Sequence, residues 1–177
     1  LMFLLKSNDQ YLIESISHLL KQKNFFHTLD ENQKYFFSLN INSIKTEMEI
    51  GSSHKKIKIP LPTTIGTLTS TINNLFIDYE IEVNGAKFYP LRQSLEFKNK
   101  HTNLGNIHFI IFSHLLLNCN EGSNKFELYK SIWPSDKEYQ INKLDTHLTN
   151  LKNYLKEKLN FSFIFTTNLG SIYFRVN

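Results

Sequence analysis

The segment that decides the fold runs from Phe126 to Asn177. It contains Phe126-Glu-Leu-Tyr-Lys-Ser-Ile-Trp133 and Leu144-Asp-Thr-His-Leu-Thr-Asn-Leu-Lys-Asn-Tyr-Leu155, and it ends in Phe163-Ile-Phe-Thr-Thr167 and Ile172-Tyr-Phe-Arg-Val176. Apolar residues at intervals of three and four predict helices over about 125–133 and 140–159. The last two stretches alternate as strands do, on either side of a tight turn at 168–171. Helix, loop, helix and hairpin in this order are typical of a winged helix-turn-helix.

The helix expected over 140–159 has two contrasting faces. Its apolar stripe consists of Leu144, Leu148, Leu151 and Leu155. The opposite face carries short hydrogen-bonding side chains, namely Asn142, Thr146, Thr149, Asn150 and Asn153. An asparagine amide pairs bidentately with adenine, and a threonine methyl group suits thymine. Lysines flank this strip where phosphates border a major groove, namely Lys143, Lys152, Lys156 and Lys158. The pattern predicts a helix that reads double-stranded DNA.

The residues before this segment complete a domain. Apolar residues from Leu104 to Leu116 predict a central helix, and alternation over 78–98 predicts strands with a hairpin turn at Asn84-Gly85. These strands form an antiparallel platform. We therefore predict two domains, residues 1–77 and 78–177.

Residues 78–177 resemble the effector domain of OmpR/PhoB-type response regulators. The resemblance lies in the Ile132-Trp133 helix end and in a following helix with Leu144, Asp145, His147, Leu148, Leu151, Lys152 and Leu155 in register. It implies that the helix over about 140–159 enters the major groove and that the wing at 168–171, with Asn168 and Ser171, touches the minor groove or backbone. It also places the loop Pro134–Tyr139 where the family contacts RNA polymerase. Trp133 is expected to anchor the helices, with its indole N–H directed to a phosphate.

This chain departs from that family on its DNA-binding face. Thr149 and Asn150 stand where arginines are usual, and Asn168-Leu169 lacks the arginine of the wing. Because fewer fixed cations displace fewer counterions, we expect weaker binding with a shallower dependence on salt.

The first 77 residues predict a small α/β unit. A strand at 2–5 leads to an amphipathic helix at 12–20, and further strands are expected at 25–26, 35–39 and 57–59. The stretch 45–56 reads as a polar segment between two of these strands. Thr63 or Thr64 is a suitable N-cap for a closing helix that extends to about Leu75.

This unit resembles a shortened, degenerate receiver domain. Lys6, Ser7 and Asn8 occupy the place of the acidic pair, with only Asp9 remaining, and residues 35–42 contain no aspartate. Aspartyl phosphorylation requires Mg²⁺ on carboxylate ligands, so we expect no phosphoacceptor. The Pro60-Leu-Pro62 arrangement is similar to short response-regulator-like proteins of alphaproteobacteria, and the Asn-, Lys- and Ile-rich composition suits an obligate intracellular, rickettsial member.

The expected fold class is therefore α+β, a C-terminal winged helix-turn-helix with an antiparallel β platform after a degenerate receiver-like α/β domain. We expect a homodimer that binds paired half-sites, with the helix at 63–76 or the helix at 12–20 as the contact. Those two helix faces serve equally well as the core of the N-terminal unit.

Composition excludes several other functions. No apolar run reaches the roughly 18 residues that span a membrane, and the single cysteine, Cys119, at the end of an apolar helix, suits a buried structural thiol in a reducing cytoplasm. The scattered histidines show no zinc-ligand spacing, and no nucleophile–base pair is visible. We expect no enzyme activity, metal or cofactor, and a cytoplasmic, nucleoid-associated protein. The net charge of +4 permits a polyanionic partner without requiring one. The alternative is a winged-helix protein-interaction module that has lost most of its DNA affinity.

Overall fold

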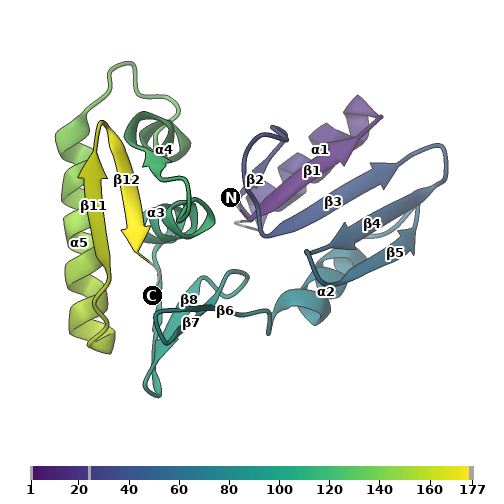
Figure 1. Ribbon diagram of the computed structural model, residues 1–177. Helices are drawn as coiled ribbons and strands as arrows, with labels where there is room; N and C mark the ends of the chain where they lie inside the picture. Colours follow the sequence, from purple (N-terminus) through teal and green to yellow (C-terminus); the bar gives the residue numbers. More distant parts are fainter. Residues whose placement is uncertain (1, 24, 176–177) are drawn as a thin grey trace. The chain divides into compact units, whose positions relative to one another are not determined.

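The computed structural model describes residues 2–23 and 25–175, and it divides the chain into two compact units (Figure 1). Unit 1 is Leu1–Asp78 and unit 2 is Tyr79–Asn177. Both units mix helices with strands, so the chain belongs to the α+β class. Among the described residues, none of the helices combines the length and the apolar character needed to cross a membrane.

Unit 1 consists of one sheet and two helices. Its elements in chain order are β1 (Phe3–Ser7), α1 (Gln10–Gln22), β2 (His27–Thr28), β3 (Phe37–Asn42), β4 (Glu47–Gly51), β5 (Lys56–Pro60) and α2 (Ile65–Phe76). The sheet order is β2-β1-β3-β4-β5. Strand β1 is parallel to β2 and β3, whereas β4 is antiparallel to both β3 and β5. Because β4 alone is reversed, β5 runs in the same direction as β1 and β3.

The mixed sheet corrects two expectations from the sequence. The stretch 45–56 contains a full strand, β4, and unit 1 is not a purely α/β domain. The connections Ser43–Thr46 and Ser52–Lys55 are much shorter than the dozen or so residues that a parallel crossover requires. Both connections therefore form hairpins. The first hairpin reverses the chain direction in β4, and the second restores it in β5.

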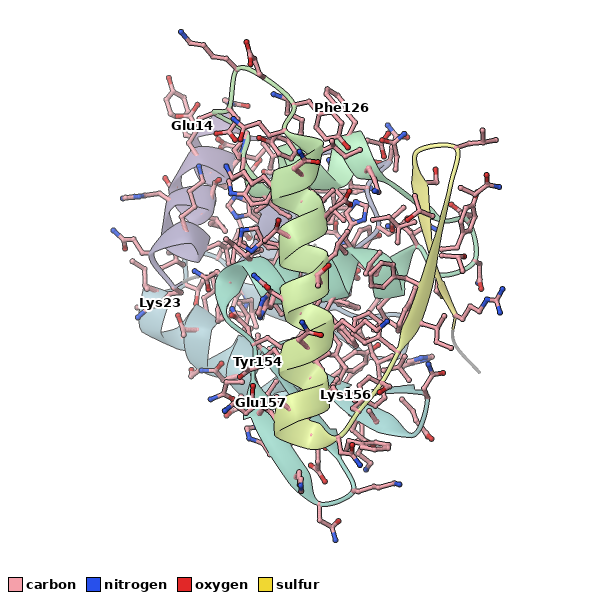
Figure 2. All side chains as sticks on the ribbon, turned by 90° about the vertical axis from the view of Figure 1, so that its left-hand side faces the viewer. Glu14, Lys23, Phe126, Tyr154, Lys156 and Glu157 are labelled. Carbon is pink, nitrogen blue, oxygen red and sulfur yellow. The ribbon has the colours of Figure 1, made fainter. Side chains whose placement is uncertain are left out.

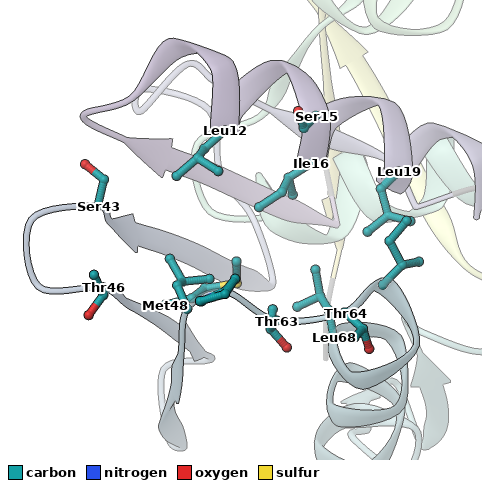
Figure 3. A pocket seen from close by; sticks show the side chains of 13 residues that line it. Leu12, Ser15, Ile16, Leu19, Ser43, Thr46, Met48, Thr63, Thr64 and Leu68 are labelled. Atoms are coloured by element: carbon teal, nitrogen blue, oxygen red, sulfur yellow. The ribbon is translucent and has the colours of Figure 1, made fainter.

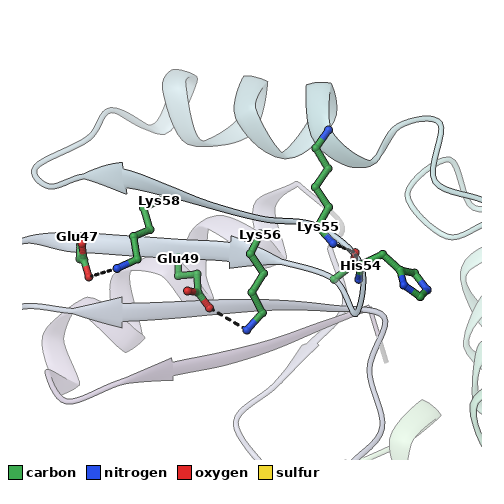
Figure 4. A network of polar contacts seen from close by, with 7 residues as sticks. Glu47, Glu49, His54, Lys55, Lys56 and Lys58 are labelled. Carbon is green, nitrogen blue, oxygen red and sulfur yellow. Dashed lines mark hydrogen bonds and ion pairs between the residues drawn. The ribbon is translucent and has the colours of Figure 1, made fainter.

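The two faces of this sheet differ in polarity. The buried side chains of β3 and β4 are Phe37, Leu39, Ile41, Met48 and Ile50. Phe37 stacks on Phe76 of α2 at 4.3 Å between ring centroids, so helix α2 covers this face. The other face is charged, and the ion pairs Lys58–Glu47 and Lys56–Glu49 cross the β4–β5 hairpin at 2.9 and 3.2 Å (Figure 4). An antiparallel hairpin tolerates such a solvated face, whereas purely parallel sheets are normally covered on both sides.

Unit 2 begins with a four-stranded antiparallel sheet in the order β6-β7-β8-β9. Its strands are β6 (Ile81–Val83), β7 (Ala86–Tyr89), β8 (Ser94–Phe97) and β9 (Lys100–Asn103). The β6–β7 hairpin turns at Asn84-Gly85, both with positive φ, at the position expected from the sequence. The platform extends one strand beyond the expected end at residue 98.

Three helices and a second small sheet follow. They are α3 (Asn106–Leu117), β10 (Ser123–Asn124), α4 (Lys125–Ile132), α5 (Ile141–Leu159), β11 (Ile164–Asn168) and β12 (Ser171–Arg175), with sheet order β10-β12-β11. Phe112 of α3 is fully buried and contacts the rings of Phe88, Phe163 and Phe174. This aromatic core joins the platform, the central helix and the C-terminal hairpin, and helix α5 packs against α3 and α4.

Candidate nucleic-acid interface

Helix α5 is fixed along its whole length, so its outer face is a defined surface. Its leucine stripe is fully buried, and Tyr154 ties it to the platform by hydrogen bonds with the Thr102 hydroxyl (2.7 Å) and the Asn103 carbonyl (2.8 Å). The helix ends at Asn160, whose φ of 55° gives a left-handed C-cap. At 1.5 Å per residue, the helix is about 28 Å long, enough to follow a major groove.

The expected polar strip lies on the exposed side of α5. Its members are Asn142, Thr146, Thr149, Asn150 and Asn153, and all five are exposed. The hydroxyls of Thr146 and Thr149 donate to the carbonyls of Asn142 and Asp145, at 2.8 and 3.0 Å. Their methyl groups and hydroxyl lone pairs are therefore the available contacts. The three asparagine amides have no hydrogen-bond partner among the described residues, so all their donors and acceptors are free to contact a partner.

The lysines around this strip fall into two groups. Lys152 and Lys156 are exposed and have no acidic partner within the described part of the chain. Lys158 pairs with Glu157 at 3.1 Å. Figure 2 shows Lys156 and Glu157 on the last turns of α5. Lys152 and Lys156 are thus the uncompensated cations of the helix.

Lys143 has a different environment from the other lysines. Its Nζ donates to Oδ2 of Asp136 at 2.8 Å and lies 4.2 Å from the ring centroid of Trp133. Trp133 is half-buried, with the rings of Tyr129 and His147 at 4.8 and 5.3 Å. Both residues are therefore engaged within unit 2, which agrees with the anchoring role expected for Trp133.

The loop 134–140 between α4 and α5 is held by Asp136 and its neighbours. The Asp136 carboxylate also accepts from the Tyr129 hydroxyl, while Lys130 donates to the Asp136 carbonyl at 2.7 Å. The hydrogen bond from Lys143, followed by that from Tyr129, lowers the pKa of Asp136 below its usual range. The loop is consequently a fixed surface rather than a free connection. Its signal in the sequence, an aspartate seven residues before a lysine, is too common to be specific.

The hairpin β11–β12 turns at Leu169-Gly170, both with positive φ. Asn168 is exposed and Ser171 is half-buried, so the two expected wing residues lie at the base of this turn. Leu169 at the tip is 97% exposed. Strand β10 also pairs with β12, and the Lys125 amide donates to the Gly170 carbonyl at 2.9 Å. This link between the start of α4 and the β11–β12 hairpin was not found from the sequence, because two residues of strand carry no periodicity.

The ends of β1 and β3 in unit 1 are polar. Ser7, Asn8 and Asn42 border a cavity of about 380 Å³ at the ends of β1 and β3. Asn8 accepts hydrogen bonds from the amide and hydroxyl of Ser43. The carboxylates that line this cavity, Glu47 and Glu49, are held in ion pairs with lysines. No group of three His, Cys, Asp or Glu side chains in residues 2–23 and 25–175 is placed to hold a metal ion.

Comparison with known proteins gives little further information. No protein-family model and no curated protein matches the chain. A solved streptococcal structure is similar over 99% of this chain and 67% of its own, with 14% identity and a TM-score of 0.44. That protein is described as one of "a novel family of redox sensors in the streptococci evolved from two-component response regulators". The likeness is too distant to indicate the fold or the function of this chain.

Proposed function

We propose that unit 2 is a winged helix-turn-helix of the OmpR/PhoB type and that the protein is a sequence-specific, double-stranded DNA-binding transcription regulator. In this proposal α4 and α5 form the helix-turn-helix, α5 enters the major groove, and the β11–β12 hairpin is the wing. The supporting observation is the outer face of α5. It combines an exposed strip of Asn and Thr with two uncompensated lysines, on a helix whose opposite face is fully buried.

The chemistry of this face suits base reading better than a general attraction to DNA. Free asparagine amides offer a donor and an acceptor in the geometry of the adenine edge, and the threonine methyl groups can contact thymine. Lys152 and Lys156 supply phosphate contacts that hold the helix in position. Asn168 and Ser171 supply polar contacts from the wing.

We also propose that unit 1 is a receiver-like domain that has lost the helices from one face of its sheet. The strand order 2-1-3-4-5 is that of flavodoxin-like, doubly wound sheets. If the helices before and after β4 are replaced by tight turns, β4 reverses while β5 keeps its direction. Helix α2 then still follows β5, as the last helix of a receiver does.

In this proposal unit 1 holds the protein as a dimer and does not accept a phosphoryl group. Asp9, the remaining acidic residue after β1, caps α1 by accepting from the amides of Tyr11 and Leu12. Incubation with acetyl phosphate and Mg²⁺ should produce no phosphoryl mass gain. A gain that disappears in Asp9→Asn would show that the switch has survived. Light scattering of the full chain measures its molar mass and so tests whether it forms a dimer.

The loop Pro134–Tyr139, held by the contacts of Asp136, is the surface proposed to contact RNA polymerase. The exposed ring of Phe126 packs against Tyr139 at 5.6 Å between centroids and adds an apolar patch beside the loop. A second candidate function, a protein-interaction module without DNA binding, is favoured by the exposed apolar side chains of the wing, Leu169 and Ile164.

Selection of bound fragments from the host genome, followed by gel shifts, tests the proposal. The double variant Thr149→Ala, Asn150→Ala should lose preference for the selected site, since each good base contact contributes about 1–3 kcal/mol of discrimination. Its affinity for random DNA should change little. Gln33→Ala, which removes an exposed amide side chain from the connection between β2 and β3, is the matched control. Equal losses on selected and random DNA would show that these residues do not read bases. No retardation at low salt would favour the interaction module.

A further inference from the structure

A groove in unit 1 separates α1 from α2. It has a volume of about 390 Å³ and is lined by 13 residues from α1, the β3–β4 hairpin and the connection from β5 into α2 (Figure 3). Leu12, Ile16 and Leu19 line it from α1, and Leu68 lines it from α2. Met48 of β4, fully buried in the sheet, also lines it.

No charged side chain lines this groove, and its polar groups are all hydroxyls. Three of these are already bonded within the unit. Ser43 donates to Asn8, Thr46 donates to the Lys45 carbonyl, and Thr64 caps α2. The other two, Ser15 on α1 and Thr63 before α2, have no hydrogen-bond partner among the described residues. The groove thus offers an apolar interior with two free hydroxyls among its lining groups.

We propose that this groove binds an uncharged, mainly apolar small molecule with a hydrogen-bonding group that reaches Ser15 or Thr63. The volume lies within the range of small-molecule sites, and so does the combination of an apolar lining with a few polar groups. A charged ligand would lose its hydration on entering the groove and would find no counter-ion among the lining residues. Burying an unpaired charge in this way costs free energy. A second copy of the chain could also cover this face, and the variants described below distinguish the two occupants. This site is independent of the DNA-binding proposal.

A matched pair of fluorescent probes tests both the site and its charge preference. N-phenyl-1-naphthylamine is uncharged, and 1-anilino-8-naphthalenesulfonate has the same ring system with an added sulfonate. The full chain should bind the uncharged probe saturably with one site per chain, and at least about tenfold more tightly than the sulfonate. Equal or tighter binding of the sulfonate would overturn the proposed ligand class.

Two tryptophan variants on α1 test the location. Ser15→Trp fills the groove and should weaken binding of the uncharged probe about tenfold or more. Glu14→Trp adds the same ring on the exposed face of α1 and should leave binding unchanged (Figure 2 labels Glu14). Circular dichroism establishes that both variants are folded, and a probe-induced rise in Tm should appear in wild type and Glu14→Trp only.

Other results would refute the site. Equal binding by the two variants would place the probe elsewhere. Loss of dimers in Ser15→Trp, together with probe binding that falls as protein concentration rises, would show that a second copy fills the groove.

Discussion

Replacing Lys152 and Lys156 together with glutamine should reduce the salt dependence of DNA binding without changing the preferred site. These two lysines are the exposed cations of α5 that lack an acidic partner among the described residues. Each phosphate contact contributes about 0.9 to the slope of log affinity against log salt. Loss of both contacts should lower the slope by about 1.8.

The same numbers give the expected change in affinity. Between 50 and 200 mM salt, a slope of about 0.9 corresponds to a roughly 3.5-fold loss of affinity for each contact. For two contacts the loss is about 12-fold. Wild-type binding should therefore weaken by about 12-fold more than binding of the double variant over this range. Fluorescence anisotropy with a labelled duplex containing the selected site measures both the slope and the change in affinity.

A third lysine on the same helix provides the control. Lys158 is already paired with Glu157 at 3.1 Å, so Lys158→Gln should leave the slope nearly unchanged. A double variant with the wild-type slope would mean that Lys152 and Lys156 do not contact phosphate. An equal reduction by Lys158→Gln would mean that only the net charge of the chain matters, and that α5 is not held in a defined position on DNA.

Three further predictions concern the scaffold of unit 2. Asp136→Asn should release the 134–140 loop and speed tryptic cleavage after Lys137 severalfold, whereas Glu138→Gln should not. Burial lowers the pKa of His114 from 6.5 to about 4, so the neutral ring stabilises the fold above pH 6.5 and this stability is lost as pH falls toward 4. Between pH 7 and 5 the loss is about 2 kcal/mol, measurable by urea unfolding, and His114→Gln should flatten that dependence. Gly122→Ala should cost roughly 2 kcal/mol or more in the same assay, because φ is +82° and the added Cβ would lie 2.6 Å from the Tyr173 ring.

Helix α5 was predictable because one periodic pattern determines both of its faces. The buried leucines define the inner stripe, and the opposite positions must then be exposed. Which lysines of α5 are paired with acidic side chains was not predictable in this way. Lys143 pairs with Asp136, which lies in a loop without periodicity, and it also lies over Trp133 at the end of α4. These contacts depend on how the loop 134–140 folds back, so sequence spacing alone grouped Lys143 with the lysines that are expected to contact phosphate.

Strand β4 was missed because its charges concealed its alternation. Glu47-Met-Glu-Ile50 has the period of two expected of a strand, with Met48 and Ile50 buried. By composition alone, without regard to the order of the residues, the stretch 45–56 is a polar segment. The glutamates are accommodated because lysines of β5 lie across the hairpin from them, and that pairing becomes visible only when the register is known.

The reversal of β4 also bears on the proposal that unit 1 does not carry out aspartyl phosphate chemistry. Receiver chemistry needs uncompensated carboxylates beside the carboxyl ends of β1 and β3, where they can hold Mg²⁺. In this chain the residues at those ends are Ser7 and Asn42, and the reversed strand begins beside them with Glu47. That carboxylate accepts a hydrogen bond from Lys58, and this bond raises the pKa of Lys58 above its ordinary value. In the proposed origin of unit 1, loss of the covering helices also placed a neutralised ion pair at these strand ends. Under this proposal, a signal that reaches unit 1 acts through another part of its surface, and the uncharged groove on the opposite, helix-covered face is the feature whose chemistry suits a ligand.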